Sequence, residues 1–198
     1  SGNYSMPHDL VERIKETNHR RKAEVIERQQ KTAKKSLGIW MISKPIIKQS
    51  DHAYLPKKRI QPHGSRLYRQ ALVIPLFDES NQIVNLQFIS PEGQKRFLTH
   101  ARKQGCFYRI GESTDILLIV EGFATGASLH EASGKQAIIA FDCGNLLSVA
   151  QNIRKLSPNS EIILCSDNDL SGIGQKKARE AALAVGGKVL IPPVVGRD

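Results

Sequence analysis

Cysteine is scarce in this sequence: only three of its 198 residues are cysteines, Cys106, Cys143 and Cys165. An odd number of widely spaced cysteines fits neither a disulfide framework nor the paired ligand spacing of a zinc site. Cys165 lies inside an apolar run, where it is expected to be a small core residue. The cysteine pattern therefore predicts a reducing, cytoplasmic setting.

Long hydrophobic runs are also missing. No apolar run approaches the roughly 20 residues that a membrane-spanning helix needs, and no secretory signal pattern opens the chain, so no membrane partner is expected. Hydrophobic residues make up 40% of the chain, enough to bury the core of one sizeable domain or two small ones. Because the chain starts without a methionine, we expect it to be a piece of a longer protein.

Acidic residues are few in the first part of the chain. Residues 1–110 hold 21 Lys and Arg against 9 Asp and Glu, whereas residues 111–198 hold 8 against 10. The net charges are therefore +12 and −2. This asymmetry predicts a basic part that faces nucleic acid beside a part that carries carboxylates. The alternative is a soluble protein with basic helical faces.

The N-terminal part is expected to hold one long helix, from Asp9 to about Ser36, without proline or glycine. Asp9 suits the N-cap, and Gly38 lies just past the predicted end. Residues 40–61 are expected to be irregular. Three regions follow from the patterns: residues 1–66 with the helix and a basic irregular segment, residues 67–112, and residues 113–198.

Residues 67–112 are expected to form a small antiparallel β unit. A hairpin is predicted at 71–77 and 83–89, followed by the short strands KRFL and GCFYRIG. Its connections carry Lys95, Arg96, Arg102 and Lys103, which we expect to bind a single-stranded nucleic acid together with nearby aromatic rings. The alternative is that the aromatics belong to the core; we favour this for Phe97 and leave it open for Tyr108.

Residues 113–198 show a β/α alternation. Strands are predicted at 115–120, 136–141, 161–166 and 187–191, with helices at 123–133, 145–156 and 172–186. Strands that alternate with helices imply right-handed crossovers and a parallel sheet of two or three layers. The predicted class is therefore an α/β fold with a parallel sheet flanked by helices, preceded by the small antiparallel unit and the long helix.

Carboxylates follow two of these apolar strands. Glu121 comes directly after ILLIV, and Asp167 and Asp169 follow IILC in the segment SDNDLSG. Ligands of parallel sheets bind outside the carboxyl ends of the strands, and three carboxylates there repel one another unless a cation joins them. The expected cation is hard and divalent, Mg²⁺ or Mn²⁺. Alternatives are charge complementarity with a helix N-terminus for Glu121 and a simple helix cap for the aspartates.

Two further sets of polar residues lie near this edge of the sheet. Asp142 follows the second strand of the β/α part, and a turn or cap role is favoured for it over a place in the site. Lys176 and Lys177 follow the aspartate loop. They could bind nucleotide phosphates, or they could lie on a solvated helix face.

The spacing of these motifs resembles the Toprim domain, which bacterial primases, type IA and type II topoisomerases and OLD-family nucleases share. The lines that carry the resemblance are LLIVEGFATGASL, AIIAFDCGNL, IILCSDNDLSGIGQKKA and KVLIPPVVGRD. They are most similar to the Toprim domains of phage and plasmid primases. The segments HAYLPKKRI, LVIPLFDESNQIVNLQFISPEGQKRFL and RKQGCFYRIG resemble the region before Toprim in those proteins, so the resemblance covers residues 51–198.

The resemblance implies that Glu121 is the catalytic glutamate and that Asp167 and Asp169 bind metal. Asp198 matches only the first member of the acidic motif that follows the last strand in the family. The implied enzyme is a nucleotidyltransferase, a DNA primase that makes RNA primers from ribonucleoside triphosphates on single-stranded DNA, with a replicative helicase as a further partner. The alternatives are an OLD-type metal-dependent nuclease and a non-catalytic module that binds or loads DNA. A topoisomerase is disfavoured because no strand-cleaving tyrosine domain accompanies the fold.

Overall fold

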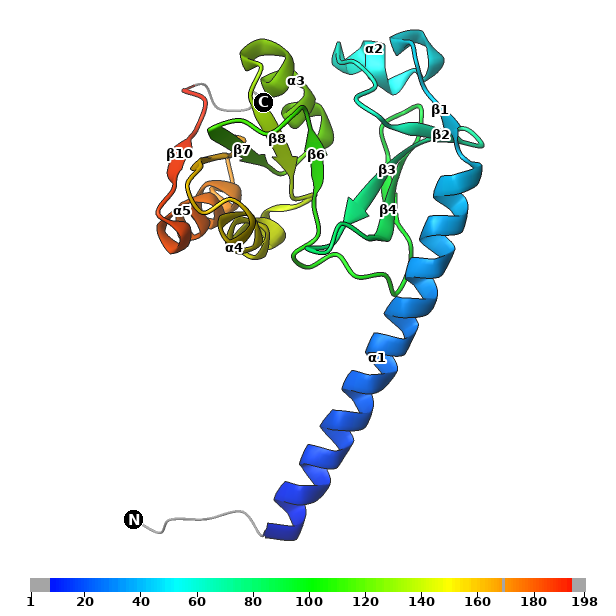
Figure 1. Cartoon of the computed structure of the whole chain (residues 1–198), viewed down its shortest axis with the longest axis vertical. Coiled ribbons are helices and arrows are strands. Elements are labelled where there is room, and N and C mark those ends of the chain that lie inside the picture. Colours follow the sequence, from blue (N-terminus) through cyan, green and yellow to red (C-terminus); the bar gives the residue numbers. More distant parts are fainter. Residues whose placement is uncertain (1–7, 169, 194–198) are drawn as a thin grey trace.

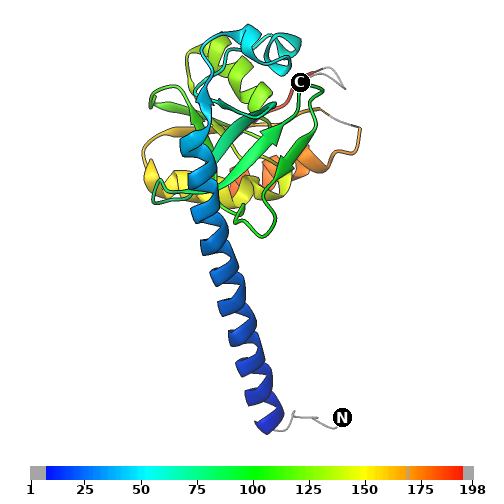
Figure 2. The same ribbon diagram turned by 90° about the vertical axis from the view of Figure 1, so that its right-hand side faces the viewer.

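A long helix and two β-sheets form the part of the chain that the structure, a computed structural model, describes. It describes residues 8–168 and 170–193. Figures 1 and 2 show a body built from both sheets and their helices, with most of the first helix projecting away from it. Within these residues, no helix combines the length and the apolar character that crossing a membrane requires.

The first helix, α1 (His8–Ile42), is longer than the sequence predicts. The predicted end near Ser36 is wrong, because the helix continues through Gly38. Its last turns pack on strand β4 (Ile83–Ile89), where buried Ser36 donates hydrogen bonds to the carbonyl oxygens of Thr32 (2.9 Å) and Val84 (3.5 Å). A glycine inside a helix costs only about 0.5–1 kcal/mol, so packing on the sheet outweighs it.

The first sheet is antiparallel, with the strand order β1-β2-β3-β4-β5. It contains the predicted hairpin, which is confirmed, and the predicted KRF strand as β5. Two short helices, η1 and α2, occupy part of the stretch expected to be irregular. The bounds are β1 (Lys44–Pro45), η1 (Gln49–Asp51), α2 (Tyr54–Lys58), β2 (Arg66–Tyr68), β3 (Ala71–Phe77) and β5 (Lys95–Phe97).

The second sheet has the order β10-β9-β7-β8-β6, and all its pairings are parallel except that of β6 with β8. The predicted β/α alternation is confirmed. Its elements are β6 (Tyr108–Ile110), β7 (Ile116–Val120), α3 (Phe123–Ser133), β8 (Gln136–Ile139), η2 (Cys143–Asn145), α4 (Leu146–Leu156), β9 (Glu161–Cys165), α5 (Ile173–Val185) and β10 (Lys188–Leu190).

The predicted sheet of strand β6 is wrong. The sequence placed this strand in the antiparallel unit, but it pairs with β8 at the edge of the second sheet. Pairing there covers an edge that would otherwise present unpaired backbone groups. A single bridge between Phe77 and Phe107, with two backbone hydrogen bonds of 2.9 Å, still links this segment to β3.

The second sheet lies between two helical layers. Alternate residues of its strands point to opposite faces: Leu118 and Val120 pack with α3, whereas Leu117 and Ile119 pack with α4 and α5. Gly126 lets α3 lie close to the sheet, since a Cβ there would be 3.0 Å from a Val120 methyl carbon.

Both sheets share one hydrophobic core on the α3 side. The same cluster of buried residues contains Ile74 and Ile89 of the first sheet and Ile139 of the second. The Phe97 ring contacts the Phe141 ring edge to face, with 6.0 Å between centroids. Phe97 therefore packs against the core, as expected.

Tyr108 is also a core residue, with 8% of its surface exposed. Its hydroxyl donates a hydrogen bond to the carbonyl oxygen of His63 (2.6 Å). Burial raises the pKa of this hydroxyl to about 12. The question that the sequence left open for Tyr108 is thereby decided: the ring is too buried to stack on a nucleotide base.

Candidate active-site cleft

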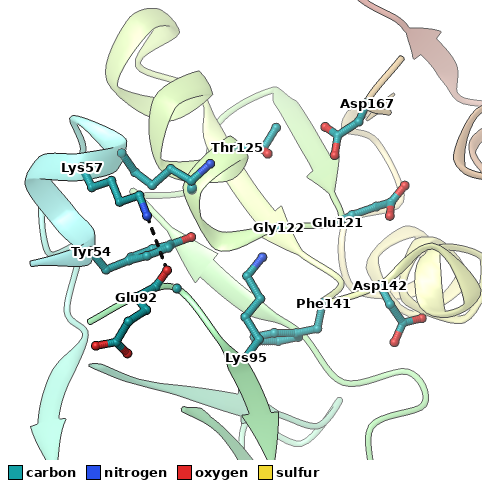
Figure 3. A pocket seen from close by; sticks show the side chains of 13 residues that line it. Tyr54, Lys57, Glu92, Lys95, Glu121, Gly122, Thr125, Phe141, Asp142 and Asp167 are labelled. Carbon is teal, nitrogen blue, oxygen red and sulfur yellow. Dashed lines mark hydrogen bonds between the residues drawn. The ribbon is translucent and has the colours of Figure 1, made fainter. Parts of the chain in front are cut away.

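Two of the predicted carboxylates lie at one edge of the second sheet. Strands β7 and β9 pair in parallel with Val120 opposite Cys165, so both strands end at this edge. Glu121 directly follows β7, and Asp167 is the second residue after β9. Both side chains line a cleft of about 470 Å³ (Figure 3). The parallel pairing therefore brings together residues that lie far apart in the sequence.

Glu121 is positioned by the first turn of α5. A Cβ built on Gly174 would lie 2.8 Å from Glu121 Oε1 and 3.2 Å from Ser166 Oγ. The carboxylate therefore reaches across the start of α5 into space that only a glycine leaves open. The partial positive charge of a helix N-terminus favours an anion there, which gives the helix-complementarity alternative a geometric basis without removing Glu121 from the cleft.

The Cys143 thiol lies close enough to Glu121 and Asp142 to interact electrostatically with both carboxylates. Its pKa is raised, first by burial and then by the charges of Glu121 and Asp142.

The loop that carries Asp167 is held on two sides. Asn168 donates from Nδ2 to the carbonyl oxygen of Pro192 (2.9 Å), and Gln175 donates from Nε2 to Asn168 Oδ1 (3.1 Å). The loop is thus fixed between α5 and the segment after β10, and these contacts set where Asp167 enters the cleft. Asp169 and Asp198 lie outside the described residues.

Two of the predicted metal ligands, Glu121 and Asp167, lie within the described residues. Among residues 8–168 and 170–193, no three His, Cys, Asp or Glu side chains are grouped so that they could hold a metal ion. Glu121 and Asp167 nevertheless supply hard oxygen donors to one cleft. Such a donor set fits Mg²⁺ or Mn²⁺, which commonly bind one or two carboxylates together with water and substrate phosphates.

Asp142 acts as a cap, as favoured from the sequence, and it also lines the cleft together with Glu121 and Asp167. Its Oδ1 accepts a hydrogen bond from the Asn145 backbone N–H (3.0 Å), and its Oδ2 pairs with the Lys103 ammonium group. Asn145 is itself buried and donates from Nδ2 to the carbonyl oxygens of Lys103, Cys106 and Ala140. The network fixes the loop before β6 onto the start of α4.

The four basic residues predicted to bind nucleic acid do not form one surface. Lys95 lines the cleft beside Glu121, whereas its neighbour Arg96 lines a hollow on the other face of the first sheet, since successive strand residues point to opposite faces. Arg102 pairs with Glu79 (2.6 Å), and Lys103 pairs with Asp142. Their role in nucleic-acid binding stays a prediction.

Two cleft lysines were missed by the sequence reasoning. Lys57 and Lys58, on α2, line the cleft with Tyr54. Figure 3 labels Lys57 and Tyr54 on this side of it. Lys57 also donates from Nζ to the carbonyl oxygen of Glu92 (3.5 Å). The adjacent lysines of HAYLPKKRI were the available signal, but only the folded chain shows that α2 faces Glu121.

Lys176 and Lys177 lie on α5. Lys177 pairs with Glu180 (2.8 Å), and Lys176 is exposed. A role in binding nucleotide phosphates stays a prediction for both.

Comparison with known proteins identifies the domain that supplies Glu121 and Asp167 to this cleft. Residues 116–198 match the family model of the Toprim domain, so this part of the chain is a Toprim domain. Over 154 residues the chain is 36% identical to the DNA primase TraC of Escherichia coli, an alignment that covers 70% of this chain. The resemblance to Toprim primases of the phage and plasmid type is thereby confirmed. The chain spans only 14% of the length of that relative.

Solved structures show the same fold. The DnaG primase catalytic domain bound to single-stranded DNA matches with a TM-score of 0.59 and 12% identity, over 87% of this chain and 74% of that one. The primase fragment of the bacteriophage T7 primase-helicase protein matches with a TM-score of 0.52 and 13% identity, over 70% and 64%. The expected fold class, a Toprim-like α/β sheet preceded by an antiparallel unit, is confirmed.

Proposed function

We propose that this chain is the core of a DNA primase, which joins ribonucleotides into RNA primers on a single-stranded DNA template. The observation that carries the proposal is the cleft itself. Glu121 and Asp167 share it with Lys57, Lys58 and Lys95. Transfer of a nucleotide from a nucleoside triphosphate requires carboxylates that bind a divalent cation and positively charged groups that bind the phosphates. The cleft contains both.

Each group has a chemical role in this proposal. Glu121 and Asp167 hold Mg²⁺ or Mn²⁺, with Asp169 and Asp198 as further ligands. A cation held there would supply charge neutralisation for the triphosphate and would favour the deprotonated form of the 3′-hydroxyl. Lys95, Lys57 and Lys58 attract the phosphates as flexible point charges. Besides its place as a ligand, Glu121 is proposed as the acceptor of the 3′-hydroxyl proton.

The competing functions use the same cleft differently. An OLD-type nuclease would direct water instead of a 3′-hydroxyl at the phosphorus, and a non-catalytic module would bind DNA without turnover. The similarity to TraC over 70% of the chain favours the primase. A replicative helicase is a proposed partner, because one relative of the same fold is a primase-helicase protein.

The test is primer synthesis from labelled ribonucleotides on single-stranded DNA with Mg²⁺ or Mn²⁺. We expect Glu121→Gln and Asp167→Asn each to reduce synthesis by about 100-fold or more, the range typical of a catalytic acid–base group. Both should also weaken Mn²⁺ binding measured by calorimetry, while single-stranded DNA affinity in EDTA changes little. Glu112→Gln and Asp115→Asn are matched controls, since neither carboxylate is among the described residues that line the cleft.

Three outcomes would contradict the proposal. Synthesis that persists in both cleft variants would show that these carboxylates are not needed. Metal-dependent loss of the input DNA without primer formation would indicate a nuclease. DNA binding without either activity would indicate a binding module.

A further inference from the structure

The first sheet has a second face, turned away from the shared core, with its own pattern of side chains. On β4 and β5, Phe88 lies directly opposite Arg96, and directly opposed residues share a face. Tyr68 on β2 is also on this face, since its ring lies 6.3 Å from the Phe88 ring in an edge-to-face arrangement. We call Tyr68, Arg69, Phe88 and Arg96 the outer aromatic face.

These residues border a hollow of about 530 Å³. Both rings are half-buried, so each is held by the sheet while part of it stays exposed. The rest of the lining is mixed, with the polar residues Gln70, Ser90 and Gln94 and the apolar residues Pro91, Phe97 and Leu98. Rigid rings beside an open hollow with both apolar and polar lining suit a flat ligand that has apolar faces and polar edges.

The charge on this face is positive. The Arg69 guanidinium lies 5.4 Å from the Tyr68 ring centroid, and exposed Arg96 donates to Gln94 Oε1 (3.3 Å). At the border, the Arg66 guanidinium lies over the Trp40 ring at 4.2 Å. Glu92 is the carboxylate among the lining residues, and it accepts a hydrogen bond from Ser90 Oγ (2.7 Å).

Arg69 stands where the backbone alone would favour glycine. It has φ +56° in the turn between β2 and β3, a conformation that disfavours residues with a Cβ and that glycine adopts without strain. The fold therefore does not require an arginine at this position, and what the residue adds is its guanidinium group.

We propose that the outer aromatic face binds single-stranded nucleic acid, with bases on Tyr68 and Phe88 and phosphates beside Arg69 and Arg96. Aromatic rings stack on unpaired bases of any sequence, and arginines add backbone contacts and cation–π contacts. Glu92 lines both this hollow and the cleft, so the two surfaces meet at the turn between β4 and β5. The inference rests on the proposed function for the choice of a DNA template as the ligand.

The test is fluorescence anisotropy of a labelled oligothymidylate, about 16 nucleotides long to span one binding surface, in EDTA so that catalysis plays no part. We expect Tyr68→Ala to weaken binding about tenfold, within the range measured for loss of one base–aromatic stack. Arg69→Gly should weaken binding severalfold and lower the salt-dependence slope by about one. Phe88→Leu, which keeps an apolar side chain in the sheet, should also weaken binding.

Arg59→Gly is the matched control. Arg59 is exposed and has the same φ of +56°, but it caps α2 instead of lying on the outer aromatic face. Neither glycine variant should lower the thermal midpoint, because both relieve a strained backbone. Wild-type affinity in Tyr68→Ala and Arg69→Gly, an equal loss in Arg59→Gly, or equal competition by duplex DNA would each overturn the inference.

The two proposals fail separately. If these variants bind like the wild type while the chain still makes primers, the outer aromatic face is wrong and the primase proposal stands. If the variants lose single-stranded DNA but the wild type makes no primer, the primase proposal fails and the binding face stands.

Discussion

Glu121 and Gly174 show how a single residue is placed by a distant one. Glu121 follows β7, yet the space for its carboxylate is left open by a glycine on α5, where a Cβ would come within 2.8 Å of Oε1. The contact is with the end of a flexible side chain, so a larger residue would move the carboxylate more readily than it would move the helix.

We therefore predict that Gly174→Ala reduces primer synthesis by about 100-fold, since a shift of about 1 Å in a reacting group can cost that much. The free energy of unfolding should not fall, because alanine favours a helix over glycine by up to about 1 kcal/mol. Steady-state primer synthesis and urea unfolding, measured on the same preparation, would check both parts.

Gly38→Ala is the matched control. Gly38 lies inside α1, and a Cβ there would meet nothing within 4 Å. It should gain the same helix preference without losing activity. Unchanged synthesis in Gly174→Ala would show that the position of Glu121 does not depend on this glycine.

The two ends of helix α1 differ in their tertiary contacts. Its last turns pack on β4, but its first half projects from the body in both views (Figures 1 and 2). The projecting part leaves large apolar side chains exposed, at Leu10, Ile14, Val25 and Ile26. A helix without tertiary contacts is marginally stable in water.

Hydrogen exchange should divide α1 at this point. Amides of residues 10–25 should exchange much faster than those of residues 32–42, because only the latter turns are held by the sheet. Exchange measured by mass spectrometry at peptide resolution would show the boundary. Equal protection along the whole helix would indicate that its first half is covered in solution, for instance by a second copy of the chain.

At the scale of the whole molecule, the two sheets share buried side chains from β3, β4, β7 and β8. The bridge between Phe77 and Phe107 also links the two parts, and the Asn145 hydrogen bonds to Lys103 and Cys106 fix the loop before Phe107 onto the start of α4. Separate cores would allow the sheets to unfold independently, whereas one core couples them.

We predict a single unfolding transition in urea. Trp40, the only tryptophan of the chain, reports on the first sheet through its contact with Arg66. Alkylation of Cys165, buried at the end of β9, reports on the second sheet. The two midpoints should coincide.

The coupling can be tested further with a core variant. Phe123→Ala removes a fully buried ring beside Tyr108 and should cost about 3–5 kcal/mol, shifting both midpoints together. Leu183→Ala, at a side chain 87% exposed, should change the free energy of unfolding by no more than about 0.5 kcal/mol and leave both midpoints nearly unchanged. Labelling of Cys165 at urea concentrations where Trp40 fluorescence is still native would contradict a shared core.

Elements with a local sequence signal could be predicted without knowledge of the fold. Apolar runs of strand length, separated by helical stretches, defined β7, β8 and β9, and the carboxylates that follow them marked the edge of the sheet. The cap role of Asp142 was also local, because its partner, Asn145, is three residues away.

Which elements pack together could not be predicted in the same way. The extension of α1 past Gly38 depends on packing against β4, and the sheet that β6 joins depends on the free edge of β8. The placement of Lys95 in the cleft and of Arg96 on the outer aromatic face depends on which side of the first sheet is covered. These arrangements depend on contacts between residues far apart in the chain. The free energy of such contacts cannot be evaluated from a short segment of sequence.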